Sequence, residues 1–128
     1  MGLFPQKMVP FHVFFTHAPP RHAQVVEAYL GESAAQLVHN PHVSPQFADL
    51  VGLPPLWVSA GDVELLKPDI DAFVRKARAA GCQVDYIKGR GMYHSYATLY
   101  PLMGDAEGLV ALQSCVRFLQ RVLAGPSP

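Results

Sequence analysis

Two short apolar segments, separated by a helix-type pattern, constrain the fold of this chain most strongly. Residues 56–60 form an apolar run between Pro55 and Gly61, and a second segment with alternating residues covers 82–88. Runs of this length, bounded by proline and glycine, predict strands that are covered on both faces. The two segments therefore predict a small sheet at the centre of the chain.

A helix-type pattern follows each of these predicted strands. Residues 68–80 begin at a proline, carry acidic side chains at positions 69 and 71 and stop at Gly81, as expected of a helix. Residues 106–123 predict a second helix with one apolar face. That face holds Leu112, Cys115, Val116, Leu119, Val122 and Leu123. The order strand, helix, strand, helix predicts an α/β chain with a parallel sheet, whose ligands bind at the carboxyl ends of the strands.

The rest of the chain is less regular, and it sets the predicted boundaries. Residues 1–22 hold four prolines and form an irregular N-terminal segment, residues 23–124 form the α/β domain, and residues 125–128 are a tail. Within the domain we expect a short helix over 23–30, then a loop, and then a proline-rich surface stretch over 40–55 with at most one helical turn, at 47–50.

Charge and cysteine content restrict the partners and the compartment. Ten basic and ten acidic side chains cancel, which argues against nucleic acid as a partner. No apolar run is long enough to span a membrane, and the first ten residues do not form a secretory signal. Cys82 and Cys115 are expected to be free thiols, which favours a cytoplasmic location. The six histidines lack the spacing of a zinc site, so we expect no metal and no other cofactor.

A carboxylate and a histidine follow the two predicted strands. Glu64 lies just after the first strand, and His94 lies thirty positions further on, just after the second. Because the carboxyl ends of parallel strands meet at one edge of a sheet, the two side chains can come within hydrogen-bonding range. An acyl-transfer triad needs a histidine that carries the proton of the nucleophile and a carboxylate that orients the imidazole. The same spacing also occurs between ordinary loop residues.

Several short motifs in this region occur together in one known family. They are Ser44-Pro45-Gln46-Phe47-Ala48-Asp49-Leu50, Gly52-Leu53-Pro54-Pro55-Leu56-Trp57-Val58, Gly61-Asp62-Val63-Glu64-Leu65-Leu66, Ala79-Ala80-Gly81 and Gly91-Met92-Tyr93-His94. In order and spacing the chain resembles the hormone-sensitive-lipase-like α/β-hydrolases of the fold-3 type over residues 24–124. The resemblance implies that residues 23–124 are the C-terminal strand-helix-strand-helix portion of an α/β-hydrolase fold, and that this fold is incomplete.

The resemblance also implies roles for individual residues. His94 matches the catalytic histidine of the family, and Glu64 matches its catalytic acid. Asp62 is the alternative acid, although a side chain at that position often caps a loop. Asp69 is a third carboxylate, which is expected to favour the N-terminus of its own helix. The implied substrate is a small carboxylic ester.

The nucleophile of the family is a serine in a Gly-x-Ser-x-Gly turn between a strand and a helix. The nearest match is Gly31-Glu32-Ser33-Ala34-Ala35, but the residues before Gly31 have a helical pattern instead of a strand pattern. Ser33 is therefore expected to be a turn or helix-end residue, and catalysis by Ser33 remains the alternative.

Two hypotheses about function follow. In the first, the chain is a member of an esterase or lipase family that carries the acid and the histidine of a catalytic triad without its own nucleophile. In the second, it is a catalytically inactive, truncated hydrolase module that acts in binding or assembly. A two-stranded sheet leaves an open edge, through which the chain is expected to form a homo-oligomer or to bind a partner chain.

Overall fold

The computed structural model describes residues 27–124, which fall into two compact units that divide between Ala48 and Asp49. The expectations for residues 1–22 and 125–128, and for the first part of the helix expected over 23–30, lie outside the described residues.

The first unit is built from short helical segments. Residues 27–30 are helical, and they are followed by the 3-10 helix η1 (Gly31–Ser33) and by α2 (Ala34–Leu37). The predicted loop after residue 30 is therefore wrong in its first part. Ala34, Gln36 and Leu37 have high helix propensity, which explains why helical structure resumes after the left-handed Gly31. The proline-rich stretch holds the 3-10 helix η2 (Pro45–Phe47), which begins two positions before the turn predicted at 47–50 and shares only Phe47 with it.

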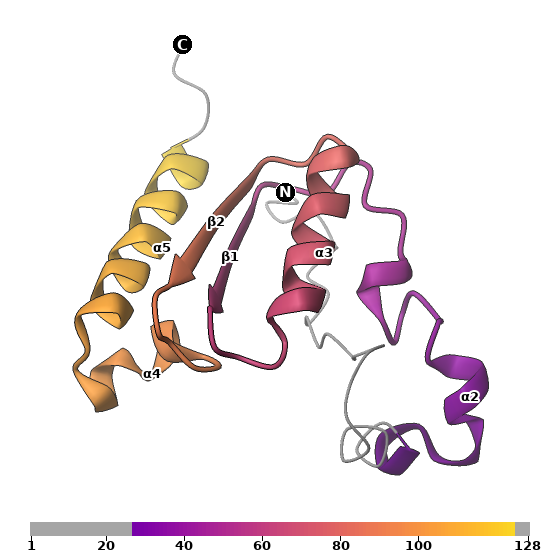
Figure 1. Cartoon of the computed structure of the whole chain (residues 1–128). Helices are drawn as coiled ribbons and strands as arrows, with labels where there is room; N and C mark the ends of the chain where they lie inside the picture. The colour runs from indigo at the N-terminus through magenta and orange to yellow at the C-terminus, as the bar shows by residue number, and fades with distance from the viewer. Residues whose placement is uncertain (1–26, 125–128) are drawn as a thin grey trace, which may run out of the picture. The chain divides into compact units, whose positions relative to one another are not determined.

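The second unit has the predicted order of strands and helices, with one additional helix. It consists of β1 (Leu56–Gly61), α3 (Lys67–Ala79), β2 (Val84–Gly89), α4 (Tyr96–Met103) and α5 (Ala106–Ala124). The two strands are parallel and pair from Leu56 with Val84 to Gly61 with Gly89. Figure 1 shows the sheet between α3 and α5. The predicted α/β class with a parallel sheet is confirmed.

Alternating side chains of β2 attach the sheet to both helices. The Tyr86 hydroxyl donates a hydrogen bond of 2.7 Å to Asp71 of α3. The neighbouring Asp85 accepts one of 2.6 Å from Arg121 of α5. Because successive side chains of a strand point to opposite faces, α3 and α5 cover the two faces of the sheet.

The core lies on both sides of this sheet. The buried side chains of α3 include Phe73, Val74 and Ala77. On the α5 side, Tyr96, Ala97 and Ala111 form a buried cluster. Trp57, Ile87 and Met92 pack against this cluster. The Trp57 indole also donates a hydrogen bond of 3.2 Å to the Ser114 hydroxyl, which connects β1 to α5.

The start of the second strand differs from its prediction. The Cys82 amide donates to the Ala77 carbonyl at 3.0 Å, a bond that closes the turn after α3, and its thiol donates to the Leu50 carbonyl at 3.0 Å. The strand begins only at Val84, two positions later than predicted. Gly81 ends the helix as expected, with a φ of +82°.

Two helical features were not predicted correctly. Helix α4 was missed because Pro101 lies inside it, and proline removes a helical hydrogen bond. The buried face of α5 holds Gly108, Ala111 and Phe118. Most of the apolar face predicted for this helix is instead exposed, namely Leu112, Val116, Leu119, Val122 and Leu123.

Candidate active site

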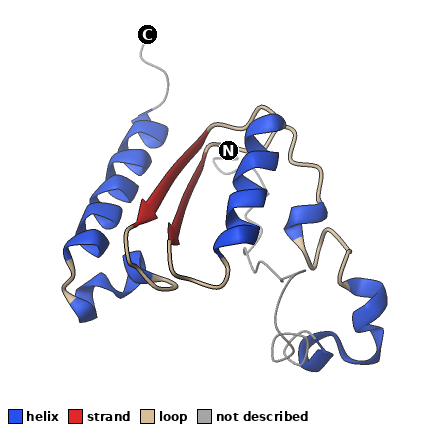
Figure 2. Ribbon diagram, viewed as in Figure 1, coloured by secondary structure: helices blue, strands red, loops and turns tan. Residues whose placement is uncertain are grey.

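The candidate site lies at the edge of the sheet where both strands end. Figure 2 shows the two arrowheads at the same end of the sheet, each followed by a loop. Glu64 lies in the loop between β1 and α3, and His94 lies in the loop between β2 and α4. The parallel register, in which Gly61 pairs with Gly89, brings these two loops together.

Glu64 and His94 are hydrogen-bonded to each other. The distance between Nδ1 of His94 and Oε1 of Glu64 is 3.3 Å, and Oε2 of Glu64 accepts a hydrogen bond of 2.8 Å from the Gly61 amide. The Glu64 side chain is 3% exposed, whereas the His94 side chain is 64% exposed. A buried carboxylate therefore contacts one nitrogen of a ring whose surface is largely open to solvent. When Nδ1 carries the proton of this hydrogen bond, Nε2 is the proton acceptor of the neutral ring.

Gly61 allows the two loops to approach. A Cβ atom at this position would overlap the Met92 carbonyl oxygen and would lie 2.7 Å from the Tyr93 carbonyl oxygen. The Val63 amide donates to the Met92 carbonyl at 3.3 Å, which joins the loops by a backbone hydrogen bond. The absence of a side chain at Gly61 thus lets the backbone just before His94 rest on the end of β1.

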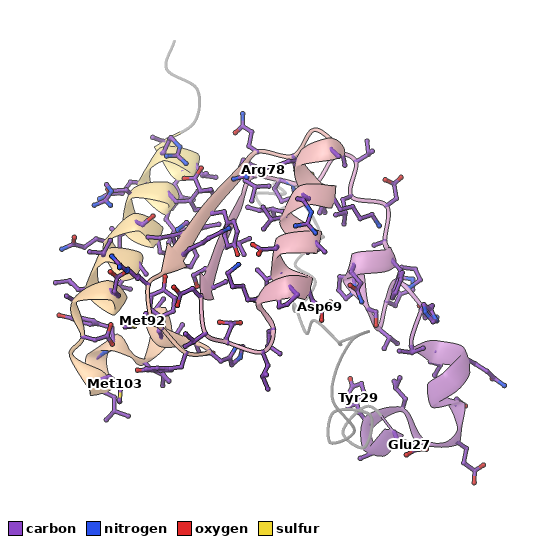
Figure 3. All side chains as sticks on the ribbon, viewed as in Figure 1. Glu27, Tyr29, Asp69, Arg78, Met92 and Met103 are labelled. Carbon is purple, nitrogen blue, oxygen red and sulfur yellow. The ribbon has the colours of Figure 1, made fainter. Side chains whose placement is uncertain are left out.

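The other two carboxylates have different surroundings. Oδ1 of Asp62 accepts a hydrogen bond of 2.6 Å from the Gly91 amide, so this side chain ties the end of β1 to the turn after β2. Asp69 is buried in the first turn of α3, where it had been expected; Figure 3 labels it there. Of the three candidate acids, Glu64 is the one that contacts His94.

Ser95, the residue directly after His94, adopts an unusual backbone conformation. Ser95 has a φ of 62° and a ψ of 18°, a left-handed conformation that is rare for residues other than glycine. Its carbonyl accepts hydrogen bonds from the amides of Thr98 and Leu99, both at 3.0 Å, and so begins α4. The reversal at Ser95 therefore ends the histidine loop and starts the helix.

Tyr96, the next residue, is fully buried against the end of β2. A Cβ atom at Gly89 would lie 2.6 Å from the Tyr96 ring, which explains the glycine at this strand end. Burial, and to a smaller extent the nearby carboxylates of Glu107, Glu64 and Asp105, raise the pKa of the Tyr96 hydroxyl. Gly89 alone does not indicate which side chain fills the space beside it.

Ser33, the alternative nucleophile, lies in the first unit. It is the last residue of η1, it is exposed, and helical residues precede it. A strand does not lead into Ser33 within the described residues, so its surroundings differ from the strand-to-helix turn that the nucleophile motif requires.

Residues 27–124 lack the features of a metal site and of a membrane-spanning helix. This part of the chain holds no group of three or more His, Cys, Asp or Glu side chains arranged to bind a metal ion. Its helices are too short or too polar to cross a bilayer. Cys82 and Cys115 are both free thiols.

Comparison with known proteins places this chain in a family. Residues 12–98 match the model of the alpha/beta hydrolase fold family, beginning earlier than the motifs noted above. An acetyl-hydrolase of Streptomyces hygroscopicus is 33% identical over 63% of this chain and 26% of its own length. An esterase of Acinetobacter venetianus is 40% identical over 56% of this chain and 24% of its own length. The chain thus spans about a quarter of these two relatives.

Solved structures support the same assignment. The chain matches the structure of EstE5 with a TM-score of 0.71 and 29% identity, over 84% of this chain and 35% of EstE5. It matches an esterase/lipase from an uncultured bacterium with a TM-score of 0.62 and 31% identity, over 68% of this chain and 29% of that one. The predicted resemblance is confirmed, and the chain belongs to the alpha/beta hydrolase fold family.

Proposed function

We propose that this chain supplies the histidine and the orienting acid of a carboxylic ester hydrolase that acts on small esters. The contact of 3.3 Å between His94 Nδ1 and the buried Glu64 carboxylate is the observation that carries this proposal. Family membership and the names of the two relatives, acetyl-hydrolase and esterase, support the reaction class.

The proposed mechanism assigns one task to each side chain. Glu64 keeps the proton of the imidazole on Nδ1, so that Nε2 of His94 can accept the proton of a serine hydroxyl as the serine attacks the ester carbonyl. His94 then returns this proton to the alcohol that leaves. Glu64 stabilises the imidazolium that exists between the two transfers, and water repeats the same steps to release the acid.

We place the nucleophilic serine outside the described part of this chain. Ser33 follows helical residues, Ser59 lies within β1 and Ser114 lies within α5. Ser44 precedes the 3-10 helix η2, and Ser95 is separated from β2 by the loop that holds His94. None of these five serines lies in a Gly-x-Ser-x-Gly turn between a strand and a helix. The isolated chain is therefore proposed to carry two members of a triad and to hydrolyse esters only together with the missing serine. Cytoplasmic location and association through the open sheet edge remain predictions.

A combined activity and labelling experiment tests this proposal. The chain is incubated with p-nitrophenyl acetate and, separately, with a fluorophosphonate probe, and labelled peptides are identified by mass spectrometry. We expect no hydrolysis beyond that of the His94→Ala variant and no labelled serine. Labelling of Ser33 that disappears in His94→Ala would show that the chain holds a complete triad and would contradict the placement of the nucleophile.

A second experiment tests the hypothesis of an inactive binding module. Mixing the chain with the N-terminal part of the Acinetobacter esterase, up to the start of the matched segment, supplies a relative's remaining fold. Recovery of ester hydrolysis that depends on both Glu64 and His94 supports the triad proposal. Binding of the two parts without any hydrolysis favours a role in assembly alone.

A further inference from the structure

A second carboxylate, that of Asp71, connects the helix that follows Glu64 to the strand that precedes His94. Asp71 lies on α3, the helix that follows Glu64, and its side chain reaches β2, the strand that precedes His94. Its Oδ1 atom accepts a hydrogen bond of 2.7 Å from the Tyr86 hydroxyl and lies 3.3 Å from Nζ of Lys88. Its Oδ2 atom accepts a hydrogen bond of 2.5 Å from Nζ of Lys67.

Lys67 extends this connection to the turn that holds Glu64. It is the first residue of α3, and its backbone amide donates to the Glu64 carbonyl at 3.3 Å. Its side chain points along the helix to Asp71, one turn further on. One carboxylate thus connects the beginning of α3, and through it the Glu64 turn, to two side chains of β2.

The surroundings of Asp71 favour the ionised form of its carboxyl group. Burial raises the pKa of the Asp71 carboxyl, but the hydrogen bonds from Lys67, Tyr86 and Lys88 outweigh it and lower this pKa to about 2. Burial, Asp71 and, more weakly, Glu64 raise the pKa of the Tyr86 hydroxyl. The phenol of Tyr86 therefore lies within the electrostatic range of both carboxylates, and hydrogen bonds to an ionised carboxylate belong to the stronger class.

We infer that Asp71 is a positioning residue for the Glu64–His94 pair, which it holds in register by fastening α3 to β2 through Tyr86. This inference rests on the proposed function. It adds Asp71 and Tyr86 to the residues on which catalysis depends, although neither contacts His94. Nothing in the sequence pattern distinguishes Asp71 from an exposed helix acid, because the contact requires the register of β2 against α3.

The test uses a property of His94 that fold stability alone would not change. The ¹⁵N chemical shifts of the imidazole report which ring nitrogen carries the proton, and they are measured at a pH of about 8.5, where an ordinary imidazole is neutral. In the unmodified chain we expect the Nδ1-protonated form. Glu64→Gln serves as the reference for complete loss of the carboxylate that orients the ring.

Three variants then separate positioning from charge and from stability. Tyr86→Phe removes one hydrogen bond to Asp71 without changing the charge, and Asp71→Asn removes the carboxylate. Asp85→Asn is the matched control, since it removes an equal charge and an ion pair from β2 on the opposite face. We expect the first two variants to move the His94 shifts at least half as far as Glu64→Gln does, and the control to leave them unchanged.

The outcomes are distinguishable. If Glu64→Gln changes the His94 spectrum while Tyr86→Phe and Asp71→Asn only lower the thermal midpoint, the positioning role is overturned and the proposed pair stands. If Glu64→Gln changes nothing, the pair itself is wrong, and the role of Asp71 falls with it. Should Asp71→Asn fail to fold, as judged by far-ultraviolet circular dichroism, the result of the milder Tyr86→Phe variant decides.

Discussion

The substitution Gly61→Ala should destabilise this chain far more than its small size suggests. The added methyl group would overlap the Met92 carbonyl oxygen and would lie 2.5 Å from the Met92 carbonyl carbon. These are backbone atoms, so rotation of a side chain cannot relieve the overlap. The loop after β2 must move away from the end of β1, and His94 must move with it.

The expected loss in free energy of unfolding follows from the contacts that Gly61→Ala would strain. Overpacking typically costs about 1–3 kcal/mol, and rigid backbone neighbours place Gly61→Ala near the upper value. Displacement of the loop also weakens the bonds from Val63 to Met92 and from Gly61 to Glu64, each worth about 1 kcal/mol. We therefore expect a loss of about 3–5 kcal/mol, a large fraction of the stability of a typical domain.

Thermal unfolding, followed by circular dichroism at one fixed protein concentration, measures this effect. Gly81→Ala is the matched control, because a Cβ at Gly81 would meet no atom within 4 Å although its φ is +82°. The control should lose only the cost of a left-handed alanine, about 1–2 kcal/mol. If Gly61→Ala is no more destabilised than Gly81→Ala, the loop carrying His94 does not rest on the end of β1, and the described site is wrong.

Two further predictions concern the residues around the site. Ser95→Gly should stabilise the chain by about 0.5–1 kcal/mol in urea unfolding, because glycine adopts the left-handed conformation at φ 62° without a steric penalty; a loss of stability would indicate an essential contact of the serine. The carboxyl of Asp71 has its pKa lowered from 3.8 to about 2, so its contribution to stability is present above pH 3.8 and is lost as the pH falls through about 2. Asp71→Asn should therefore flatten the dependence of the urea midpoint on pH between about 4 and about 2, and an unchanged slope would contradict the hydrogen bonding described for Asp71.

The sequence allowed the overall plan to be predicted because its local signals agree. Pro55 and Gly61 delimit β1, and Gly81 ends α3 in the left-handed conformation that glycine favours. These signals require only short-range information. They placed Glu64 and His94 after two parallel strands, and parallel pairing then brings the two loops to one edge.

Features that depend on distant partners were missed. Helix α4 contains Pro101, and its position is supported by the burial of Tyr96 and Ala97, which local propensity does not reveal. The buried face of α5 includes the small residues Gly108 and Ala111. A Cβ atom at Gly108 would lie 2.9 Å from the Tyr100 side chain of α4, so the close approach of α4 favours glycine over the larger apolar residues used for the prediction. The contact between Asp71 and Tyr86, which are fifteen positions apart, likewise depends on how α3 packs against β2.

The most direct test of the proposed site is the protonation of His94 in the unmodified chain and in Glu64→Gln. Because the Gly61 amide requires an acceptor, the carbonyl oxygen of the introduced glutamine side chain should take that position, and its amide group should then face Nδ1 of His94. We predict that the proton moves from Nδ1 to Nε2, as expected when an amide replaces the orienting carboxylate. Identical imidazole ¹⁵N spectra for the two proteins would show that Glu64 does not orient His94.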